Sequence, residues 1–457
     1  MSVASRIREK AVEWAVTRVV KMAQRGARGK NFERRLGRML RLAAFITRDP
    51  LWSAVVQGVH EKLRNGHPAI GVARRLLTRM NPNVRKNIVG SLIVHETLLG
   101  AAKRHAIEDA GLGYYPPSFF VVSPSMYCNL KCYGCYASEY DPKEQLSFEE
   151  MDDLMNQAKD LGMYFCVISG GEPYCYKPLL DVFEKHRDMT FQTYTAGMHL
   201  TDAVVDRLAE LGNVVPCISC EGFEAETDRR RGKGAFKKVI RAMHRLREKG
   251  IVFGFSATVT CENAEVISSE KFIDFYSEQG CLIGWYFQYI PIGRSPVFEL
   301  MATPEQRAMV GRRVRRWREC KEIFLVDFWN DGEHAGGCIA GGRKYFHVNN
   351  RGDVEPCVFC HFASDNLREK PLREILGSGI MTAIRKRQPY HEDLRRPCML
   401  IDNPHVLRDV VAETDAYPTH PGAESLITKF AEPLDEYAKA FGEVLKDEEK
   451  STWTMHI

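Results

Sequence analysis

The sequence lacks any run of eighteen apolar residues without a charge, so a membrane-spanning helix is not expected. Its amino-terminal stretch lacks the compact apolar segment and small-residue cleavage site of a secretory signal. The chain also has no internal repeat and no low-complexity segment. Its 457 residues, of which 44% are hydrophobic and 27% charged, instead predict a globular protein of two or three domains.

The positive charge of the chain is unevenly distributed. The formal net charge is only +5, but residues 1–50 contain thirteen Lys and Arg against four Asp and Glu. A basic arm on a near-neutral body favours an anionic partner. Among such partners we expect peripheral contact with a membrane surface through residues 1–50, and we do not expect nucleic acid. A solvated helical face is the alternative that the composition leaves open.

Fourteen cysteines are present, and several of them are grouped at spacings used by metal ligands. In a small secreted protein, so many cysteines would indicate disulfides. A long chain without an export signal, with its cysteines in such groups, favours thiolates that bind metal in a reducing compartment. We therefore expect a cytoplasmic location, with a peripheral position at the membrane surface as the variant that the basic arm suggests.

The pattern of apolar residues changes along the chain and predicts four segments. These are a helical basic region (1–113), a core barrel (114–332), a cysteine-rich auxiliary domain (333–400) and a helical tail (401–457). Helical periodicity in the first segment is clearest over Ile7–Val20, Phe32–Ile46 and Val84–His105. The Gly- and Cys-rich composition of the third segment fits a small domain held together by metal.

The second segment predicts an α/β fold. Six short apolar runs have the length of buried strands, and a helical stretch follows each of the first five. The expected strands cover Phe119–Val122, Tyr164–Ser169, Phe191–Thr195, Val214–Cys220, Val252–Thr260 and Ile283–Ile290. Such alternation implies right-handed crossovers and a parallel sheet, with the active site at the carboxyl ends of the strands. We predict a partial (β/α)6 barrel.

Cys128, Cys132 and Cys135 form a C-x3-C-x2-C run just after the first expected strand. Three thiolates on one short loop can ligate three corners of a [4Fe–4S] cluster and leave one iron open. A structural zinc site needs four ligands, and no fourth ligand lies nearby at the spacing of a zinc ribbon. The run therefore predicts an iron–sulfur cluster with an open iron.

This run resembles the signature of the radical S-adenosylmethionine (SAM) superfamily, and the resemblance extends over roughly residues 115–400. It implies that SAM binds the open iron through its amino and carboxylate groups. One electron from the reduced cluster would then split the sulfonium, and the 5′-deoxyadenosyl radical would abstract a hydrogen atom from a substrate. The resemblance also implies a reductant such as flavodoxin or ferredoxin, and a protein that orients both molecules and excludes water.

Two further stretches resemble SAM-binding motifs of this superfamily. Ser169–Pro173, with the sequence SGGEP, closes the second expected strand as the GGE motif does, which implies contact with the methionine amino group. Ile218–Gly222 resembles the S-x-D-G strand end that faces the ribose, with Glu221 where Asp is usual. The implied SAM contacts are Gly170, Gly171, Glu172, Pro173, Ser219 and Glu221.

The chain departs from the superfamily pattern at two positions and matches it at another. Gly134 stands where many members have an aromatic residue near the adenine, and Tyr133 or Tyr136 is the expected substitute. Thr195–Gly197 reads T-A-G in place of the common T-N-G. Asp228–Phe236 resembles the D-x-x-R-G-x-G-x-F stretch of members with auxiliary clusters, with a basic solvated loop as the alternative.

A second group of cysteines comprises Cys338, Cys357, Cys360 and Cys398. Their spacing resembles the SPASM and Twitch extensions of the superfamily, which hold auxiliary iron–sulfur clusters. A hairpin over Lys344–Asp353 is expected between the first two ligands. A full SPASM domain has seven cysteines for two clusters, so four cysteines favour a Twitch-like domain with one cluster. Zinc is the alternative metal for the same four thiolates.

The other cysteines and the histidines give weaker indications. Cys166, Cys217 and Cys220 lie on expected strands, where free cysteine is commonly a small core residue. Cys175 follows the SGGEP stretch and could face the active site, and His199 lies near another motif. The sequence identifies no catalytic general base.

Three functions are compatible with these motifs. A maturase that modifies a peptide or protein side chain is favoured, because SPASM and Twitch domains are frequent in such enzymes. A membrane-associated enzyme acting on a lipid or isoprenoid is the first alternative; it draws on the basic residues 1–50 and on Gly134, a position shared with radical enzymes of hopanoid biosynthesis. A non-catalytic iron–sulfur electron carrier is the second alternative, and the full set of SAM motifs argues against it.

Overall fold

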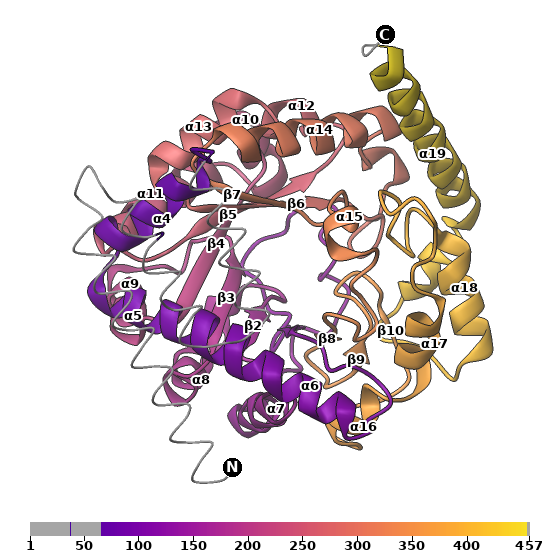
Figure 1. The fold of residues 1–457 in the computed structure, drawn as a ribbon, viewed down its shortest axis with the longest axis horizontal. Helices are drawn as coiled ribbons and strands as arrows, with labels where there is room; N and C mark the ends of the chain where they lie inside the picture. Colours follow the sequence, from indigo (N-terminus) through magenta and orange to yellow (C-terminus); the bar gives the residue numbers. More distant parts are fainter. Residues whose placement is uncertain (1–36, 38–64, 455–457) are drawn as a thin grey trace.

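The computed structural model of the chain describes Gly37 and residues 65–454 (Figure 1). The helical runs expected over Ile7–Val20 and Phe32–Ile46, and the basic arm of residues 1–50, lie outside the described residues except for Gly37. Within the described ranges, no helix is both long and apolar enough to cross a membrane. The fold consists of a curved sheet with helices outside it, a smaller domain at one edge of the sheet, and helices across one end.

Seven parallel strands follow one another both in sequence and in space, in a sheet of order β7-β6-β5-β4-β3-β2-β1-β8-β9. The parallel strands are β1 (Phe119–Val122), β2 (Phe165–Ile168), β3 (Thr190–Thr195), β4 (Val214–Cys220), β5 (Gly254–Val259), β6 (Ile283–Gln288) and β7 (Phe324–Asp327). Neighbouring strands are in register, with Phe120 opposite Cys166 and Cys166 opposite Phe191. The partial barrel that strand–helix alternation predicts is confirmed.

Helices return the chain between these strands and cover the outer face of the sheet (Figure 1). They are α7 (Phe148–Asp160), η2 (Pro173–Cys175), α8 (Leu179–Lys185), α9 (Asp202–Leu211), α10 (Glu224–Arg231), α11 (Ala235–Glu248), α12 (Ala264–Ile267), α13 (Glu270–Gln279), η3 (Phe298–Leu300) and α14 (Pro304–Cys320). Local signals set their ends. Ser147 and Glu150 form a capping box before α7, and Gly212 ends α9 with a φ of 73°.

Strand β7 was not expected from the sequence. It overlaps a short apolar run, residues 323–326, but only Leu325 and Asp327 of its four residues are buried, and Phe324 is exposed. Its backbone pairs in parallel with β6, which supplies the hydrogen bonds that define it as a strand. Local composition and pairing with β6 therefore both favour a strand here.

The chain after β7 extends the sheet at its opposite edge. Strand β8 (His347–Val348) pairs in parallel with β1, and β9 (Val354–Glu355) pairs antiparallel with β8, which gives the hairpin expected over Lys344–Asp353. A separate pair joins β10 (Phe362–Ala363) to β11 (Tyr417–Pro418). The helices of this region are α15 (Gly332–Ala335), α16 (Leu372–Ile375), α17 (Gly379–Arg387), α18 (Pro404–Glu413), η4 (Ala423–Leu426) and α19 (Ala431–Thr454).

The helices before β1 lie across the amino-terminal ends of the strands. They are α4 (Ala69–Arg79), α5 (Pro82–Val89), the π-helix η1 (Gly90–Gly100) and α6 (Ala101–Asp109), and they account for the helical run expected over Val84–His105. Asn87 Nδ2 donates to the Leu211 carbonyl just before β4 at 2.7 Å. Glu96 accepts from the Tyr164 N–H just before β2 at 2.8 Å. This end of the barrel is therefore closed by helices, and the carboxyl ends of the strands face the other way.

Candidate active site

The loop between β1 and α7 carries the first group of cysteines at the carboxyl ends of the strands. Cys128 is exposed, whereas Cys132 and Cys135 are partly buried. Although part of Cys128 is exposed, the protein around its thiol removes enough water to raise its pKa to about 11, and the charges of Glu172 and of the other two cysteines add to this effect. The three thiols are thus close enough to act on one another. The Leu130 N–H also donates to Cys128 Sγ at 3.4 Å, which curves the loop around this sulfur.

The segment after β6 fixes the cysteine loop in place. The Arg294 N–H donates to the Cys135 carbonyl at 3.0 Å, and its guanidinium donates to the Cys132 carbonyl at 3.4 Å. A Cβ on Gly293, where φ is 85°, would lie 2.2 Å from the Cys135 carbonyl oxygen. Sequence reasoning missed these residues because Arg294 and Cys132 are 162 positions apart.

Gly134 lies against the ring of Tyr289. Its φ is 64°, and a Cβ at this position would be 2.7 Å from the Tyr289 Cε2 atom. Of the two tyrosines considered as substitutes for the missing aromatic residue, Tyr133 donates its hydroxyl to Glu262 at 2.6 Å, and Tyr136 packs against the auxiliary domain. An aromatic ring does stand beside this position, but it comes from the end of β6.

The SGGEP turn after β2 packs directly against the backbone that leads to Cys128. A Cβ on Gly170 would lie 2.4 Å from the Ser125 carbonyl oxygen, and one on Gly171 would lie 2.2 Å from that of Tyr127. The N–H groups of Gly171 and Glu172 donate to these same two carbonyls at 3.1 and 2.8 Å. Two glycines are required here because any side chain would separate the turn from the cysteine loop.

The Glu172 side chain joins the ends of β2 and β3. Its carboxylate is buried and accepts from Thr195 Oγ1 at 2.6 Å, from the Ala196 N–H at 2.9 Å and from the Tyr174 N–H at 3.3 Å. Burial raises the pKa of Glu172, and these donors oppose the shift by stabilising the carboxylate. Both carboxylate oxygens are engaged, so this side chain braces the turn whose backbone faces the cysteine loop.

Ser219 and Glu221, the two residues implied to face the ribose, have different surroundings. Ser219 is partly exposed at the end of β4, with its Oγ 3.2 Å from Ser256 Oγ. Glu221 is 1% exposed, and its Oε1 accepts from Arg230 Nη1 at 2.7 Å and Arg231 Nε at 2.8 Å. Its Oε2 is buried without a hydrogen-bond partner in the described structure. The predicted contact between Glu221 and the ribose of SAM therefore depends on Oε2.

The Asp228–Phe236 stretch is not a solvated basic loop. The side chains of Arg230 and Arg231 are only 10% and 12% exposed. Arg230 Nη2 also reaches the Gly134 carbonyl in the cysteine loop at 3.4 Å. Burial raises the pKa of Cys135, and both guanidinium groups oppose that shift. Two cations thus lie beside the cysteine loop, where they favour thiolates.

The second group of cysteines comes together around the β8–β9 hairpin. Cys357 and Cys360 share a tight turn in which the Cys360 N–H donates to the Cys357 carbonyl at 2.9 Å. The charge of Cys338 acts on Cys357, whose pKa is raised to about 12, mainly by burial. Burial is the main cause that raises the pKa of Cys398, and the charges of Asp402, Cys338 and Cys357 add to the increase. Cys398, distant in sequence, therefore joins the other three thiols in space.

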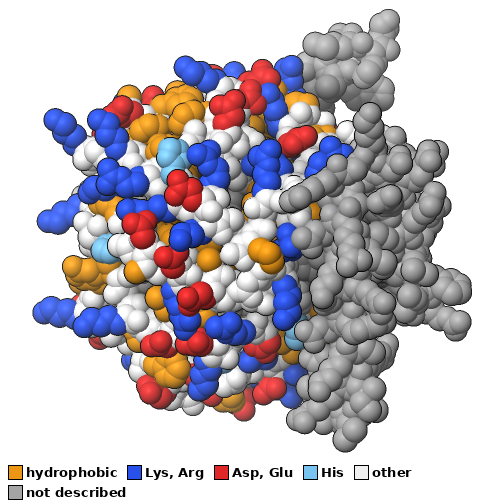
Figure 2. All heavy atoms as spheres, turned by 90° about the vertical axis from the view of Figure 1, so that its left-hand side faces the viewer, with side chains coloured by type: hydrophobic (Ala, Val, Ile, Leu, Met, Phe, Trp, Pro, Cys, Tyr) orange, Lys and Arg blue, Asp and Glu red, His pale blue; other side chains and the backbone are white. Residues whose placement is uncertain are grey.

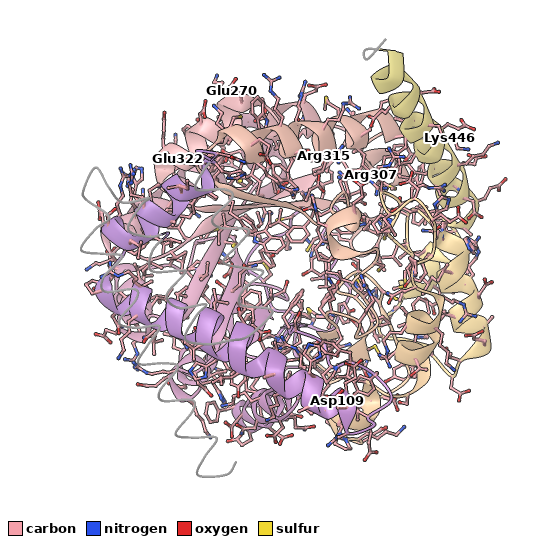
Figure 3. All side chains as sticks on the ribbon, in the orientation of Figure 1. Asp109, Glu270, Arg307, Arg315, Glu322 and Lys446 are labelled. Carbon is pink, nitrogen blue, oxygen red and sulfur yellow. The ribbon has the colours of Figure 1, made fainter. Side chains whose placement is uncertain are left out.

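A buried ion pair fixes the backbone of Cys398. The Asp402 carboxylate accepts from the Cys398 N–H at 2.9 Å and from two nitrogens of Arg307 at 2.5 and 3.1 Å. Arg307 and Asp402 are both fully buried, and the Arg307 guanidinium lies 3.9 Å from the Phe441 ring centroid. Figure 3 shows Arg307 on α14, where that helix meets α19. The sequence carried no motif for this arrangement.

The numbers of thiols in the two cysteine groups fit two iron–sulfur clusters. In a [4Fe–4S] cluster the thiolates bind different irons. Three thiols on a partly exposed loop fit a cluster with one open iron, and four buried or partly buried thiols fit a fully ligated one.

Aromatic side chains line the inner face of the sheet between the two cysteine groups. Along β6, alternate residues are partly exposed, which places Trp285 and Phe287 on the inner face. Their rings are stacked at 3°, and Tyr194 from β3 meets Phe287 edge-on at 5.3 Å. Phe359 packs on Phe287 at 6.4 Å and on Tyr136 at 5.1 Å. This cluster is hereafter called the inner aromatic surface.

The remaining cysteines divide as expected into core and non-core positions. Cys166, Cys217 and Cys220 are buried in strands, where burial raises their pKa values. Cys175 is partly buried, and its Sγ lies 3.3 Å from His199 Nε2. This contact joins the turn after β2 to the loop after β3.

The comparisons with known proteins agree with this geometry. The sequence profile of the Radical SAM superfamily matches residues 122–267, and that of the SPASM iron–sulfur cluster-binding domain matches residues 338–399. The chain therefore contains a radical SAM domain and a SPASM-type domain. Fe-coproporphyrin III synthase of Methanosarcina barkeri is 26% identical over 60% of this radical SAM chain and 79% of its own. The mycofactocin maturase MftC of Mycolicibacterium smegmatis is 28% identical, and the match covers 59% of this chain and 70% of MftC.

Solved structures share the fold of this radical SAM protein. SuiB of Streptococcus suis bound to SAM gives a TM-score of 0.55 at 19% identity, covering 67% of this chain and 77% of SuiB. SuiB bound to its precursor peptide SuiA gives a TM-score of 0.54 at 18% identity, and the match covers 65% of this chain and 74% of SuiB. At these identities the likeness concerns the fold alone.

The protein is therefore a radical SAM enzyme. Its cofactors are a [4Fe–4S] cluster with an open iron, SAM, and an auxiliary iron–sulfur cluster in the SPASM-type domain. When bound, the first two supply one-electron cleavage of SAM and hydrogen abstraction from a substrate.

Proposed function

We propose that this radical SAM enzyme modifies a side chain of a peptide or protein from which it removes a hydrogen atom. In this proposal, the SAM-binding cluster is ligated by Cys128, Cys132 and Cys135. The auxiliary cluster is ligated by Cys338, Cys357, Cys360 and Cys398. SAM is contacted by Gly170, Gly171, Glu172, Pro173, Ser219 and Glu221. The four segments 1–113, 114–332, 333–400 and 401–457 remain our division of the chain.

The observation that carries the proposal is the inner aromatic surface between the two cysteine groups. Tyr136 directly follows Cys135, and Phe359 stands between Cys357 and Cys360, so one ring contact of 5.1 Å connects the two groups. A side chain placed on these rings would be removed from water while it faces both groups. Exclusion of water protects a reactive intermediate from side reactions.

The chain's own residues divide the work at this site. Arg230, Arg231 and Arg294 hold the cysteine loop, and the backbone of the SGGEP turn offers a close approach to it. The Trp285 Nε1–H is buried without a hydrogen-bond partner in the described structure, so it can donate to a backbone or side-chain oxygen of a substrate. A peptide supplies both an apolar side chain and such an oxygen.

The comparisons support a peptide substrate at the level of class. One relative is named a mycofactocin maturase, and one structural neighbour was solved with its precursor peptide. As further parts of the proposal, flavodoxin or ferredoxin donates the electron, and the enzyme works in a reducing cytoplasm. Contact between residues 1–50 and an anionic membrane surface, and with it the lipid alternative, concerns residues outside the described ranges.

The first test is anaerobic reconstitution followed by counting of iron and sulfide. We expect about eight irons in the wild type and about four after Ala replaces Cys128, Cys132 and Cys135 together, since one of two [4Fe–4S] clusters is lost. Formation of 5′-deoxyadenosine should disappear in the triple variant. Cys320→Ala, which removes an exposed cysteine outside both groups, should keep all iron and activity. A count of four irons together with bound zinc would show that the second cysteine group holds zinc and not an auxiliary cluster.

The second test concerns the substrate. The reconstituted enzyme is incubated with short peptides encoded beside its gene, and the products are analysed by mass spectrometry and fragmentation. A mass change confined to one side chain, dependent on SAM and absent in the triple variant, would support the proposal. Full 5′-deoxyadenosine production that no peptide stimulates, and no change of any peptide, would refute the peptide assignment.

A tetrapyrrole is the second candidate substrate. Aromatic rings such as those of Trp285 and Phe287 can stack on a planar macrocycle, and one relative is named Fe-coproporphyrin III synthase. Absorbance titration with iron coproporphyrin separates the candidates. Saturable binding that Trp285→Ala weakens at least tenfold would favour the tetrapyrrole over the peptide.

A further inference from the structure

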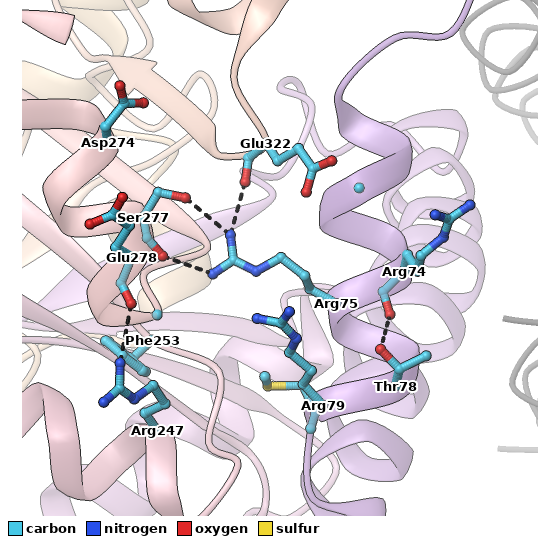
Figure 4. Close-up of a pocket in the computed structure, with 13 residues that line it drawn as sticks. Arg74, Arg75, Thr78, Arg79, Arg247, Phe253, Asp274, Ser277, Glu278 and Glu322 are labelled. Atoms are coloured by element: carbon cyan, nitrogen blue, oxygen red, sulfur yellow. Dashed lines mark hydrogen bonds between the residues drawn. The ribbon is translucent and has the colours of Figure 1, made fainter. Parts of the chain in front are cut away.

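A pocket of about 510 Å³ lies between α4 and the amino-terminal ends of β5, β6 and β7 (Figure 4). Phe253, Gly280 and Glu322 line it, and each of them comes shortly before one of these strands. The cysteine groups and the inner aromatic surface lie toward the carboxyl ends. The pocket is therefore separate from the active site and has no part in the function proposed above.

Arginine dominates the lining of this pocket. Four arginines line it, Arg74, Arg75 and Arg79 from α4 and Arg247 from α11, and the Arg74 guanidinium points away from it (Figure 4). Figure 4 shows the side chains of Arg75 and Arg79 next to each other on the inner side of α4. Elsewhere on the side of the molecule that carries α4, basic and acidic side chains are interspersed (Figure 2). The pocket thus concentrates positive charge that the surrounding surface balances.

Arg75 fixes α4 to the barrel without losing its charge. Its Nη1 donates to Ser277 Oγ at 3.2 Å and to the Glu322 carbonyl at 3.1 Å. Its Nη2 donates to the carbonyls of Ser277 and Cys281 at 3.2 and 3.3 Å. All four acceptors are neutral. Burial, and then the charge of Arg79, lowers the pKa of Arg75, and the opposing effect of the Glu322 carboxylate is too small to offset them. The pocket is therefore preformed and cationic.

Asp274, Glu278 and Glu322 also line the pocket, but none of their carboxylates is paired with Arg75, Arg79 or Arg247. Asp274 is bound by Lys321, with oxygen–nitrogen distances of 2.7 and 3.0 Å. The Glu322 carboxylate lies over the backbone of Gly71, where a Cβ would be 2.0 Å from Glu322 Cδ. Arg247 donates to a backbone carbonyl, that of Glu278, at 3.1 Å. Within the described residues, no carboxylate forms an ion pair with Arg75, Arg79 or Arg247.

We propose that this pocket binds a phosphate ester, with Arg79 and Arg247 donating to the phosphate oxygens and Arg75 adding its charge from below. The planar guanidinium group matches a phosphate in bidentate fashion and is preferred for such contacts. The volume exceeds that of a bare phosphate and leaves room for an attached organic group beside Met80 and Phe253. The ester is either a soluble phosphorylated metabolite or the headgroup of an anionic lipid. Either one would bind at the end of the barrel opposite the radical chemistry.

The test uses the full chain and three probes: inorganic phosphate, glycerol 3-phosphate, and vesicles of phosphatidylglycerol in phosphatidylcholine. The pocket variant combines Arg79→Gln with Arg247→Gln. The control combines Lys238→Gln with Arg241→Gln, two exposed positions on α11 outside the pocket that remove the same charge. Calorimetry measures the soluble probes, and co-sedimentation measures the vesicles. If the double variant unfolds, Arg79→Gln alone replaces it, because that side chain is exposed.

We expect the pocket variant to bind at least one organic phosphate probe tenfold or more weakly than wild type, while the control is unchanged. Loss confined to glycerol 3-phosphate would identify a soluble metabolite, and loss confined to vesicles would identify a lipid headgroup. Equal weakening in both variants would mean that only overall charge matters and would overturn the proposal. The absence of binding to any probe would overturn it as well. Radical SAM activity is not used as the readout, so failure here leaves the proposed function untouched.

Discussion

Gly134 shows how one residue shapes the cysteine loop. It is held between Cys132 and Cys135 at a φ of 64°, with the Tyr289 ring where a side chain would begin. The loop can therefore pass close to the end of β6, where Arg294 holds two of its carbonyls. A glycine at this position is a steric requirement of the neighbouring tyrosine.

Replacement of Gly134 by Ala should destabilise the loop. The left-handed backbone costs an L-residue about 1–2 kcal/mol, and the contact with Tyr289 adds about 1–3 kcal/mol of overpacking. We expect the variant to retain less iron after reconstitution than the wild type. Gly66→Ala is the matched control, since Gly66 has a φ of 65° but no atom within 4 Å of the added Cβ. Equal iron contents in the two variants would contradict the role of Tyr289.

Asp327 gives the fold a defined dependence on pH. Burial, and then the Asp331 carboxylate, raises the pKa of Asp327 to about 6 from an ordinary value of 3.8. Because the folded state holds this proton more tightly, the stabilisation is complete below pH 3.8 and is lost as the pH rises through 6. The loss amounts to about 3 kcal/mol at most.

Urea unfolding at pH 5, 6 and 7 can isolate this effect by comparison with Asp327→Asn. We expect the free energy of unfolding of the wild type to fall over this range relative to that of the variant. Other titrating groups contribute equally to both proteins, so the difference between them reports on this carboxyl. Parallel curves would show that Asp327 titrates normally in the fold.

The sequence predicts residues of this site where a motif marks them, and fails where only space connects them. The two cysteine groups and the SGGEP turn are recognisable because their spacing along the chain carries the chemistry. Tyr289 and Arg294 have no such spacing, since they meet the cysteine loop only after five strands intervene. Arg230 lay within a recognised stretch, but its contacts with Glu221 and Gly134 could not be read from the stretch itself.

At the scale of elements, a buried ion pair joins α14 to the loop that carries Cys398. Arg307 on α14 binds Asp402, and Asp402 binds the Cys398 N–H. Both charges are fully buried, so the loss of either leaves the other without a partner in a medium of low polarity. The helix and the cysteine therefore depend on one carboxylate.

Asp402→Asn should lower the free energy of unfolding by about 3–5 kcal/mol, because the Arg307 charge loses its partner. It should also reduce the iron content toward the four atoms of a single cluster. Arg408→Gln, which breaks an ion pair whose side chains are 29% and 49% exposed, should cost less than about 1 kcal/mol and keep all iron. Thermal unfolding and iron analysis measure both effects. A full complement of iron in Asp402→Asn would show that Cys398 does not need this contact.

Helices and strands with complete local signals were predictable, and those that depend on pairing were not. The helix α7 begins at a capping box, and β2 is a continuous apolar run. By contrast, β7 has only two buried residues, and β8 and β9 have two residues each. The hairpin of β8 and β9 was predictable from its turn residues, but its addition to β1 was not, because nothing in the turn specifies the neighbouring strand.

At the scale of the whole molecule, the barrel and the auxiliary domain share one sheet. Val121 and Val122 of β1 are in register with His347 and Val348 of β8. His347 is buried and joins Ser123 Oγ, 2.7 Å from its Nε2, to the Glu355 carboxylate, 2.6 Å from its Nδ1. These contacts cross the boundary between the two regions, so neither is complete without the other.

We expect the metal-free protein to unfold in a single transition. Far-ultraviolet circular dichroism reports on all helices, and tryptophan fluorescence is sensitive to Trp329, which contacts Phe287 of the barrel and Phe359 of the auxiliary domain. Coincident transitions in urea would support one cooperative unit. Two separate transitions would show instead that the auxiliary domain unfolds independently of the barrel.

The pairing of β8 with β1 also determines how this enzyme can change its specificity during evolution. Main-chain hydrogen bonds, which do not depend on side-chain identity, set the spacing between the two cysteine groups. If the inner aromatic surface binds the substrate as proposed, mutation of its rings can alter the size and shape of the accepted molecule while the distance between the two cysteine groups stays constant. Selection for new substrates can act on residues such as Trp285 and Phe287 without rebuilding the redox centres.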